Sequence, residues 1–304
     1  MTEGGVETRL VDFGRPMVRI PNLAIHLFRE IKDAGLKLDP QKHVVPIVGL
    51  EDAPPLDQLL ATELRAGDAG GVSAEQILSF ELMTYDTQPA CVVGGRGEFI
   101  SAARLDNLAS SHAALCALLG AADAGPAPFT RVVVLYDHEE AGSRSAQGAG
   151  GTFLADVLER VVAGFKGGEA QGLPRAVANS SLVSVDMAHA VHPNYADKHE
   201  SGHHPVIGAG PVIKVNANLA YASDAETAGL FSAICAAQGV TPQHFVTRSD
   251  LACGSTIGPI SAARIGIRTV DVGNPMLAMH SCREMAGTAD VEPMIDVLTT
   301  YFAR

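Results

Sequence analysis

Short apolar runs alternate with helical stretches from Arg104 to the end of the chain. The runs are rich in β-branched residues, which is typical of strands buried on both faces of a sheet. Strands are predicted at 131–136, 181–187, 211–216, 244–248 and 267–272, and helices at 105–119, 151–164, 223–238 and 291–302. Strands that alternate with helices predict an α/β fold with a mostly parallel central sheet flanked by helices.

Residues 1–98 lack this alternation. A helix is predicted after Pro21, others at 56–65 and from Ser73, and the rest is rich in loops. Ser73 and Gln76 have the spacing of a capping box. Two strand-like runs, at 90–93 and 98–102, flank a glycine-rich hairpin turn. The change in pattern predicts two domains, residues 1–98 and 99–304.

Composition excludes several classes of protein. The chain has 304 residues, of which 47% are hydrophobic, and a net charge of −12. No apolar run reaches the roughly 20 residues of a membrane span, and the acidic balance argues against nucleic acid as a partner. The start has neither the basic end nor the apolar core of a signal peptide. The five cysteines include no CxxC pair, so we expect reduced thiols and a cytoplasmic location.

The predicted strand at 131–136 is followed by Asp137, His138, Glu139 and Glu140. Strand ends are where α/β proteins present charged groups to ligands. Adjacent glutamates raise each other's pKa unless a cation holds them. A divalent metal could bind one glutamate while the other acts as a general base on water. By itself, the pair is also compatible with a solvated acidic loop.

Three further residues have similar positions at the ends of predicted elements: Asp106, Asp186 and His280. Each has a purely structural alternative, since Asp106 could cap a helix and His280 could be a buried, hydrogen-bonded histidine. Taken jointly with the glutamates, they resemble an oxygen-rich site for two divalent metals with one bridging aspartate.

Two other features remain open from the residues alone. A histidine-rich stretch, in which His189 and His192 are the first two histidines, is either a polar surface loop or a functional one. Lys214 lies inside a strand-like run, where a lysine needs an anionic partner. That partner is either a structural carboxylate or an acidic ligand.

Six ordered motifs closely resemble the aspartyl aminopeptidase family, and the resemblance runs from about Arg9 to Tyr301. The motifs are Arg104-Leu-Asp-Asn-Leu108, Asp137-His-Glu-Glu-Ala-Gly-Ser143, Asp186-Met-Ala-His-Ala-Val-His-Pro-Asn-Tyr195, Gly210-Pro-Val-Ile-Lys-Val-Asn216, Cys253-Gly-Ser-Thr-Ile-Gly-Pro259 and Ala278-Met-His-Ser-Cys-Arg-Glu284. The resemblance implies a cytosolic two-zinc exopeptidase that removes N-terminal Asp or Glu from peptides. It also implies a zinc-exopeptidase-like catalytic domain at 99–304, with residues 1–98 as the C-terminal part of an inserted dimerisation domain.

The resemblance also implies roles for individual residues. Asp106 would bridge two Zn²⁺ ions, Glu140 and His280 would complete one site, Asp186 would serve the other, and Glu139 would be the general base.

Substrate and subunit contacts are implied in the same way. Lys214 would meet the acidic side chain of the substrate, and His189, His192 and Tyr221 would line its pocket. His26 would reach the active site of a neighbouring subunit, in a homodimer that builds to a dodecamer.

One departure from the family stands out. Family members carry an amino-terminal His-x-Asp motif whose histidine is a ligand of the metal that Asp186 binds, and no His-x-Asp occurs in this chain. We therefore expect an N-terminally truncated chain with one incomplete zinc site. The alternatives are a catalytically impaired assembly or regulatory subunit, and a two-metal aminopeptidase of neutral specificity, against which Lys214 argues.

Overall fold

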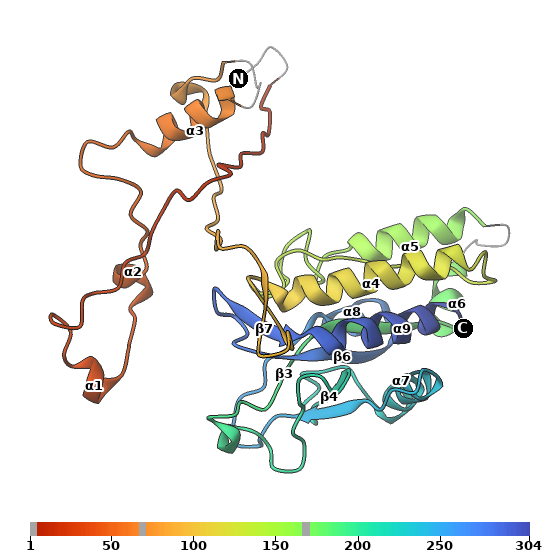
Figure 1. Ribbon diagram of the computed structural model, residues 1–304. Helices are drawn as coiled ribbons and strands as arrows, with labels where there is room; N and C mark the ends of the chain where they lie inside the picture. The colour runs from red at the N-terminus through yellow and green to blue at the C-terminus, as the bar shows by residue number, and fades with distance from the viewer. Residues whose placement is uncertain (1–4, 67–70, 166–170) are drawn as a thin grey trace. The chain divides into compact units, whose positions relative to one another are not determined.

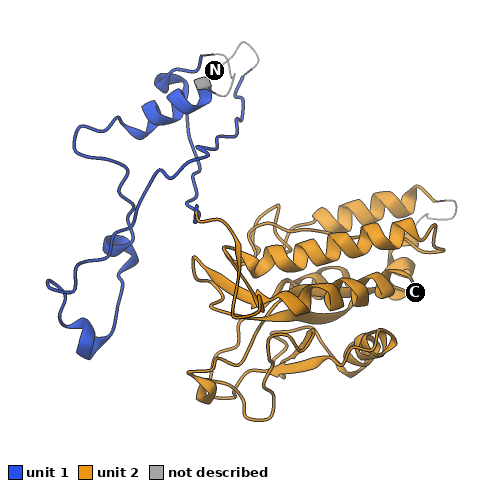
Figure 2. Ribbon diagram, viewed as in Figure 1, with its two compact units in different colours: residues 1–87 blue, residues 88–304 orange. Residues whose placement is uncertain are grey.

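The computed structural model describes residues 5–66, 71–165 and 171–304 (Figure 1). The chain divides into two compact units, Met1–Thr87 and Gln88–Arg304 (Figure 2). The division lies before residue 98 because Cys91–Val93 (β1) pairs with Phe99–Ala102 (β2) in an antiparallel hairpin, so both strands belong to the second unit. The assignment of the first part of the chain to a dimerisation domain stays a prediction.

The first unit is built from short elements. It contains α1 (Ile31–Ala34), α2 (Pro40–His43), α3 (Leu56–Ala66) and a 3₁₀ turn at Ala74–Gln76. The capping box of Ser73 and Gln76 is confirmed, whereas the helix predicted after Pro21 is reduced to turns and α1. Several of its leucines are largely exposed, among them Leu10 at 96% and Leu50 at 85%.

A seven-stranded sheet forms the centre of the second unit. Besides β1 and β2 it contains β3 (Ser181–His189), β4 (Val212–Val215), β5 (Gln243–Val246), β6 (Arg268–Leu277) and β7 (Glu284–Gly287). The order is β1-β2-β7-β6-β4-β5, and β3 pairs with the other edge of β6. β6 pairs directly with three strands, β3, β4 and β7, more than any other strand of the sheet.

The α/β class is confirmed, but the expectation of a mostly parallel sheet is wrong for the described residues. Only β3–β6 and β4–β5 are parallel, while β1–β2, β2–β7, β4–β6 and β6–β7 are antiparallel. The connections within β1–β2 and β6–β7 span only residues 94–98 and 278–283. A parallel crossover needs a dozen or more residues, so such short connections reverse the chain direction.

Residues 131–136 are a second departure, because this apolar run forms no strand. Within the described residues its backbone makes no hydrogen bond to other backbone groups. Val132 and Leu135 are 41% and 58% exposed. A strand requires a hydrogen-bonded neighbour, and the run has none in the described part of the chain.

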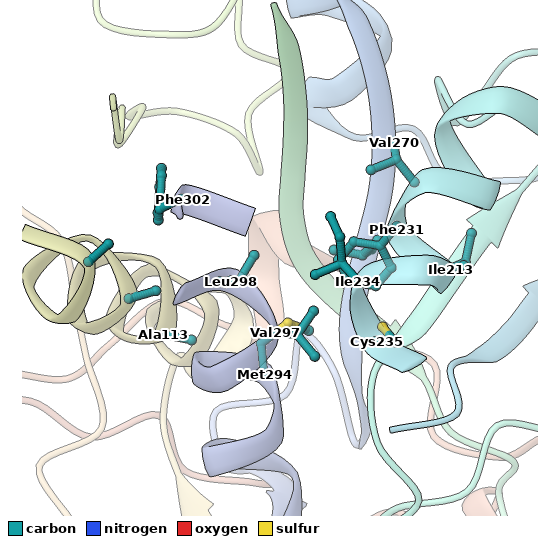
Figure 3. Packing of buried hydrophobic residues seen from close by; sticks show 13 residues of the cluster. Ala113, Ile213, Phe231, Ile234, Cys235, Val270, Met294, Val297, Leu298 and Phe302 are labelled. Atoms are coloured by element: carbon teal, nitrogen blue, oxygen red, sulfur yellow. The ribbon is translucent and has the colours of Figure 1, made fainter. Parts of the chain in front are cut away.

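Helices pack on the sheet around one main core cluster (Figure 3). The helices of the second unit are α4 (Leu105–Asp123), α5 (Phe153–Ala163), α6 (Gly172–Ala178), α7 (Ala225–Ala237), α8 (Ile257–Ile265) and α9 (Val291–Phe302). α4, α7 and α9 supply the cluster, which also contains Ile213 of β4 and Val272 of β6. Since side chains alternate along a strand, the neighbours Lys214 and Asp271 point to the opposite face of the sheet. Within the described residues, no helix has the length and hydropathy of a membrane-spanning segment.

α4 is confirmed as a helix, but the face that packs against the core cluster is formed by alanines rather than by Leu115 and Leu119. Ala113, Ala117 and Ala121 are buried in the core cluster, whereas Leu115 and Leu119 are 46% and 58% exposed. Alanines four residues apart form one helix face. Small side chains on that face allow α9 to pack closely against α4.

This arrangement predicts that the alanine face is the sensitive one. Ala117→Leu should destabilise the second unit by about 1–3 kcal/mol through overpacking. Leu119→Ala should change stability by about 0.5 kcal/mol or less, because the side chain is largely in solvent. Urea unfolding followed by circular dichroism measures both variants. A larger loss of stability for Leu119→Ala than for Ala117→Leu would contradict the packing of the alanine face against α9.

Candidate metal centre and adjoining pocket

Three of the predicted metal ligands meet at one point. Ligand atoms of Asp106, Glu140 and His280 all lie within 4.8 Å of one another. His280 Nε2 is 3.2 Å from Asp106 Oδ2 and 3.1 Å from Glu140 Oε2. Asp106 follows β2, Glu140 follows residues 131–136, and His280 follows β6. The fold thus gathers the first turn of α4 and two loops, which are far apart in the sequence.

Asp186 does not belong to this group of three. It lies near the end of β3, and its Oδ2 atom accepts a hydrogen bond from Lys214 Nζ at 2.8 Å. Lys214 is only 2% exposed and also donates to the Met187 carbonyl at 2.9 Å. Burial by itself would raise the pKa of Asp186, but the ammonium of Lys214 outweighs burial and lowers it. The anionic partner of the buried lysine is therefore Asp186.

Negative charge is concentrated around Asp106. Its side chain is 6% exposed. Burial, followed by the charges of Asp186, Glu140 and Glu284, raises the pKa of Asp106 to about 8. Burial and the charges of Asp186 and Glu140 also raise the pKa of Glu139. Carboxylates so crowded are stabilised in their charged form by a nearby cation.

Sequence reasoning missed the role of Glu284, the first residue of β7. This side chain is 3% exposed and accepts two backbone hydrogen bonds, from Asp106 N at 2.9 Å and from His280 N at 2.7 Å. β7 lies between β2 and β6 in the sheet, so Glu284 holds together the first turn of α4, which follows β2, and the loop that follows β6. The only signal in the sequence is an acidic residue directly before an apolar strand, four residues after His280.

The predicted substrate residues His189, His192 and Tyr221 line one pocket of about 300 Å³. Tyr221 is buried, and its ring packs edge-on against Phe245 with ring centroids 6.3 Å apart. Lys214 Nζ lies 5.2 Å from the Tyr221 ring centroid. Burial raises the pKa of the Tyr221 hydroxyl, so it stays protonated and able to donate.

The cations that line this pocket are Lys198 and Arg248. Arg248 is held by Asp250, at 2.9 and 2.7 Å, and by the Asp197 carbonyl. No pattern in the sequence distinguishes Arg248 from other surface arginines, so it was not among the predicted site residues.

His26 lies in a turn of the first unit, and its side chain is exposed. A role in another subunit's active site therefore stays a prediction.

The donor set of Asp106, Glu140 and His280 fits zinc. Zn²⁺ is bound by imidazole nitrogen and carboxylate oxygen, and three protein ligands with one open position are typical of catalytic zinc sites. Among the described residues, this is the one set of three or more such side chains that lie this close, so a second set around Asp186 is incomplete there.

The second unit is an α/β domain in which carboxylates and a histidine gather at one edge of the sheet. This arrangement is typical of metal-dependent hydrolases that bind a catalytic ion at the strand ends. The family described as Aminopeptidase I zinc metalloprotease (M18) matches residues 1–302. The chain belongs to this family of zinc metallo-aminopeptidases, and the resemblance stated from the motifs is confirmed at this level.

Relatives and solved structures agree with this assignment. The chain is 49% identical over 304 residues to the probable M18 family aminopeptidase 2 of Stutzerimonas stutzeri, with 99% of this chain and 68% of the relative covered. The Ape4 chain solved in the cryo-EM complex with Nbr1 is 39% identical with a TM-score of 0.89, covering 96% of this chain and 59% of that chain. The mApe1 dodecamer of S. cerevisiae is 27% identical with a TM-score of 0.78, covering 99% of this chain and 66% of that one. The chain thus spans about six to seven tenths of these proteins' lengths.

Glu284 should act as a positioning residue for two metal ligands. Glu284→Ala removes both backbone contacts and should weaken zinc affinity by about 10–100-fold. Glu284→Gln keeps one oxygen acceptor, so its zinc affinity should lie between that of Glu284→Ala and that of the unmodified chain. Zinc affinity is measured by competition with a chromophoric chelator.

The matched control is Glu226→Ala, because Glu226 makes an exposed ion pair with Arg268. All measurements are made at a temperature where circular dichroism shows every variant folded. Unchanged zinc affinity in folded Glu284→Ala would refute the positioning role.

Proposed function

We propose that this chain carries the metal centre and substrate pocket of an aminopeptidase that hydrolyses the first peptide bond of peptides. The observation that carries the proposal is the group of Asp106, Glu140 and His280, whose ligand atoms lie within 4.8 Å of one another. Glu139 is the sequence neighbour of Glu140, and Asp186 lies on β3, the strand that pairs with β6. The pocket with His189, His192 and Tyr221 would receive the N-terminal residue of the peptide.

Asp106, Glu140 and His280 would hold one zinc ion. A bound zinc supplies Lewis-acid polarisation of a carbonyl and lowers the pKa of water. Asp106 would be shared with a second ion that Asp186 serves, as the family resemblance implies. For that second site the described residues offer no third ligand close by.

Glu139 would take the proton of the attacking water and later deliver it to the leaving amine. A general base works best with a pKa near the working pH. Burial and the neighbouring carboxylates move the pKa of Glu139 in that direction. Glu284 would keep Asp106 and His280 at a fixed separation during turnover.

For the substrate we propose an N-terminal Asp or Glu, with Lys214 as the selecting residue. A buried cation favours an acidic side chain and penalises an apolar one. Lys214 already donates a hydrogen bond to Asp186. Its ammonium group would therefore have to interact with both a candidate metal ligand and the substrate carboxylate. Arg248, which lines the pocket, is the second cation that could meet an acidic side chain.

A neutral specificity is the second candidate. Tyr221, Phe245, Met276 and Leu277 give the pocket an apolar wall, and Lys214 makes two internal hydrogen bonds. If these contacts persist with substrate bound, apolar N-terminal residues would be preferred.

Self-association is proposed as well, as a homodimer that builds a larger assembly. Many large apolar side chains of the first unit are exposed, among them Leu10 and Leu50, and contact with a second copy would bury such side chains. One solved relative is titled as a dodecamer. The free cysteines fit a reducing, cytoplasmic location.

The overall proposal is tested by zinc content and turnover in one preparation of residues 1–304. We expect one tightly held zinc ion per chain. We also expect the Asp-anilide to be hydrolysed faster than the Leu-anilide. Chelation of the zinc should abolish this hydrolysis, and added zinc should restore it. One zinc without hydrolysis of either substrate would favour the alternative of a catalytically impaired assembly subunit. Two zincs would mean that another side chain completes the second site.

Glu139→Gln separates proton transfer from metal binding. Turnover should fall by about 10²–10⁴-fold, because an amide cannot take the proton. Zinc content should stay unchanged, since Glu139 is not among the three grouped ligands. Steady-state kinetics and elemental analysis of the same sample measure both. Full activity in this variant would refute the assignment of the base.

Lys214→Met and Arg248→Met decide between the two cations. We measure binding of aspartate hydroxamate and leucine hydroxamate by calorimetry, which requires no turnover. Lys214→Met should reduce the preference for the aspartate ligand by about 30-fold or more, which corresponds to about 2 kcal/mol. A preference that survives Lys214→Met but disappears in Arg248→Met assigns selection to Arg248. An unmodified chain that prefers the leucine ligand supports neutral specificity.

A further inference from the structure

Asp271 is a fully buried carboxylate that the proposed mechanism does not use. It lies on β6 and is 0% exposed. It does not line the pocket of His189 and Tyr221. Burying a carboxylate costs free energy unless hydrogen bonds compensate for the lost water. The hydrogen-bond partners of Asp271 therefore indicate what this side chain does.

One carboxylate oxygen of Asp271 holds the segment that carries Tyr221. Asp271 Oδ2 accepts a hydrogen bond from the backbone N–H of Ala222 at 2.6 Å. Ala222 directly follows Tyr221, whose side chain is 5% exposed and lines the pocket. The backbone N–H of Asp271 donates to Ser223 Oγ at 2.8 Å. The Tyr221 segment is thus bound to β6 through both the side chain and the backbone of Asp271.

These contacts lie where β4 and β6 separate. The pairing of β4 with β6 covers Val212 opposite Gly273 and Ile213 opposite Val272. Asp271 is the next residue of β6, and here the segment that follows β4 supplies the hydrogen-bonding groups instead of a paired strand. The position of Tyr221 therefore depends on side-chain contacts of Asp271 more than on the strand ladder.

The other carboxylate oxygen holds a second wall of the pocket. Asp271 Oδ1 accepts from Thr256 Oγ1 at 2.7 Å. Thr256 directly precedes α8 and follows the 251–254 loop, three residues of which line the pocket. The carboxylate also lies against the first turn of α8, where a Cβ on Gly258 would clash with both oxygens. The free N–H groups of a helix start stabilise a negative group placed there. One carboxylate thus joins two walls of the same pocket.

The two walls also touch each other. Cys253 of the 251–254 loop packs against the buried cluster that contains Tyr221 and Phe245. Its Sγ atom accepts a hydrogen bond from Thr247 Oγ1 at 3.1 Å. A displacement of this loop would therefore reach the Tyr221 ring directly.

We infer that Asp271 is a positioning residue of the pocket, which holds Tyr221 and the 251–254 loop at a fixed separation through its two carboxylate oxygens. Side chains that receive a substrate keep their geometry only when residues behind them fix their positions. The kinetic part of this inference rests on the proposed function. The part that concerns the position of Tyr221 does not, because it can be measured without substrate.

The test follows Tyr221 by ¹⁹F NMR in residues 1–304 labelled with 3-fluorotyrosine. The line of Tyr221 is identified by its loss in Tyr221→Phe. Asp271→Ala removes both links and should displace this line. It should also raise KM for the Asp-anilide by about tenfold and change kcat by less than about threefold, because Asp271 does not contact the candidate metal ligands.

Two milder variants show whether the hydrogen bonds are responsible. In Asp271→Asn the amide oxygen can accept from Ala222 N–H, and the amide nitrogen can donate to the Thr256 hydroxyl, which accepts as well as donates. This variant should retain the Tyr221 line and the KM of the unmodified chain. Thr256→Val removes only the second link and should displace the line less than Asp271→Ala does. It also allows the test if Asp271→Ala does not fold.

Asp290→Ala is the matched control. Asp290 is 1% exposed and accepts two backbone hydrogen bonds, from Gly208 N at 2.7 Å and Gly210 N at 2.9 Å. These three residues do not line the pocket. The control should lose stability but keep the Tyr221 line and KM. All variants are compared at a temperature where circular dichroism shows them folded.

Several results would overturn the inference. One is an unmoved Tyr221 line in folded Asp271→Ala or, where that variant does not fold, in Thr256→Val. Others are an equal displacement in Asp290→Ala, a displacement in Asp271→Asn as large as in Asp271→Ala, and, in a chain that hydrolyses the anilide, an unchanged KM for Asp271→Ala. An unmodified chain without hydrolysis would contradict the proposed function alone, and a displaced Tyr221 line in Asp271→Ala would still support the positioning role.

Discussion

The parallel pairing of β3 with β6 is the constraint on which the rest of the second unit depends. It runs from Ser181 opposite Arg268 to His189 opposite Met276, so both strands end at the same edge of the sheet. Asp186 and the loop that carries His280 are thereby brought to that edge. The two backbones approach so closely that a Cβ on Gly273 would clash with the Asp186 carbonyl oxygen. Any side chain at position 273 would therefore disturb the strand that carries a candidate metal ligand.

Charge at this edge is unbalanced, and this imbalance explains the chemistry that the site can perform. Lys214 is buried against Asp186 and lowers the pKa of that carboxyl, while Asp106, without such a partner, has a pKa raised to about 8. Glu284 does not neutralise the negative charge of Asp106, because it is itself a carboxylate. Its oxygens accept hydrogen bonds from the backbone N–H groups of Asp106 and His280. A divalent cation bound by Asp106, Glu140 and His280 would restore the balance. Geometry and electrostatics thus point to the same ligand class.

The sequence predicted most helices of the second unit and the residues of the candidate site. It failed for features that depend on contacts between residues far apart in the chain. The periodicity of α4 identified a helix, but not that Ala117 rather than Leu119 would face α9, because periodicity does not say which face meets a neighbour. The run at 131–136 reads as a strand, yet strand formation depends on a hydrogen-bonded neighbour that local sequence does not reveal. The direction of β7 followed from its short connection to β6, which outweighed the preference of α/β proteins for parallel strands. Glu284 was missed because its function lies in backbone contacts to the first turn of α4 and to one loop, for which no motif exists.

The order of residue types was enough to predict most helices and strands of the second unit and the donor chemistry of the site. Carboxylates and histidines follow apolar runs, and those residue types favour a cation as the ligand if they meet in one site. Which of these groups meet depends on the three-dimensional arrangement of the strands. Asp106, Glu140 and His280 converge, whereas Asp186 turns to Lys214. The physical reason is that these contacts join residues far apart in the chain, and their distances are fixed by the pairing of β2, β7, β6, β3 and β4 in one sheet rather than by any local preference.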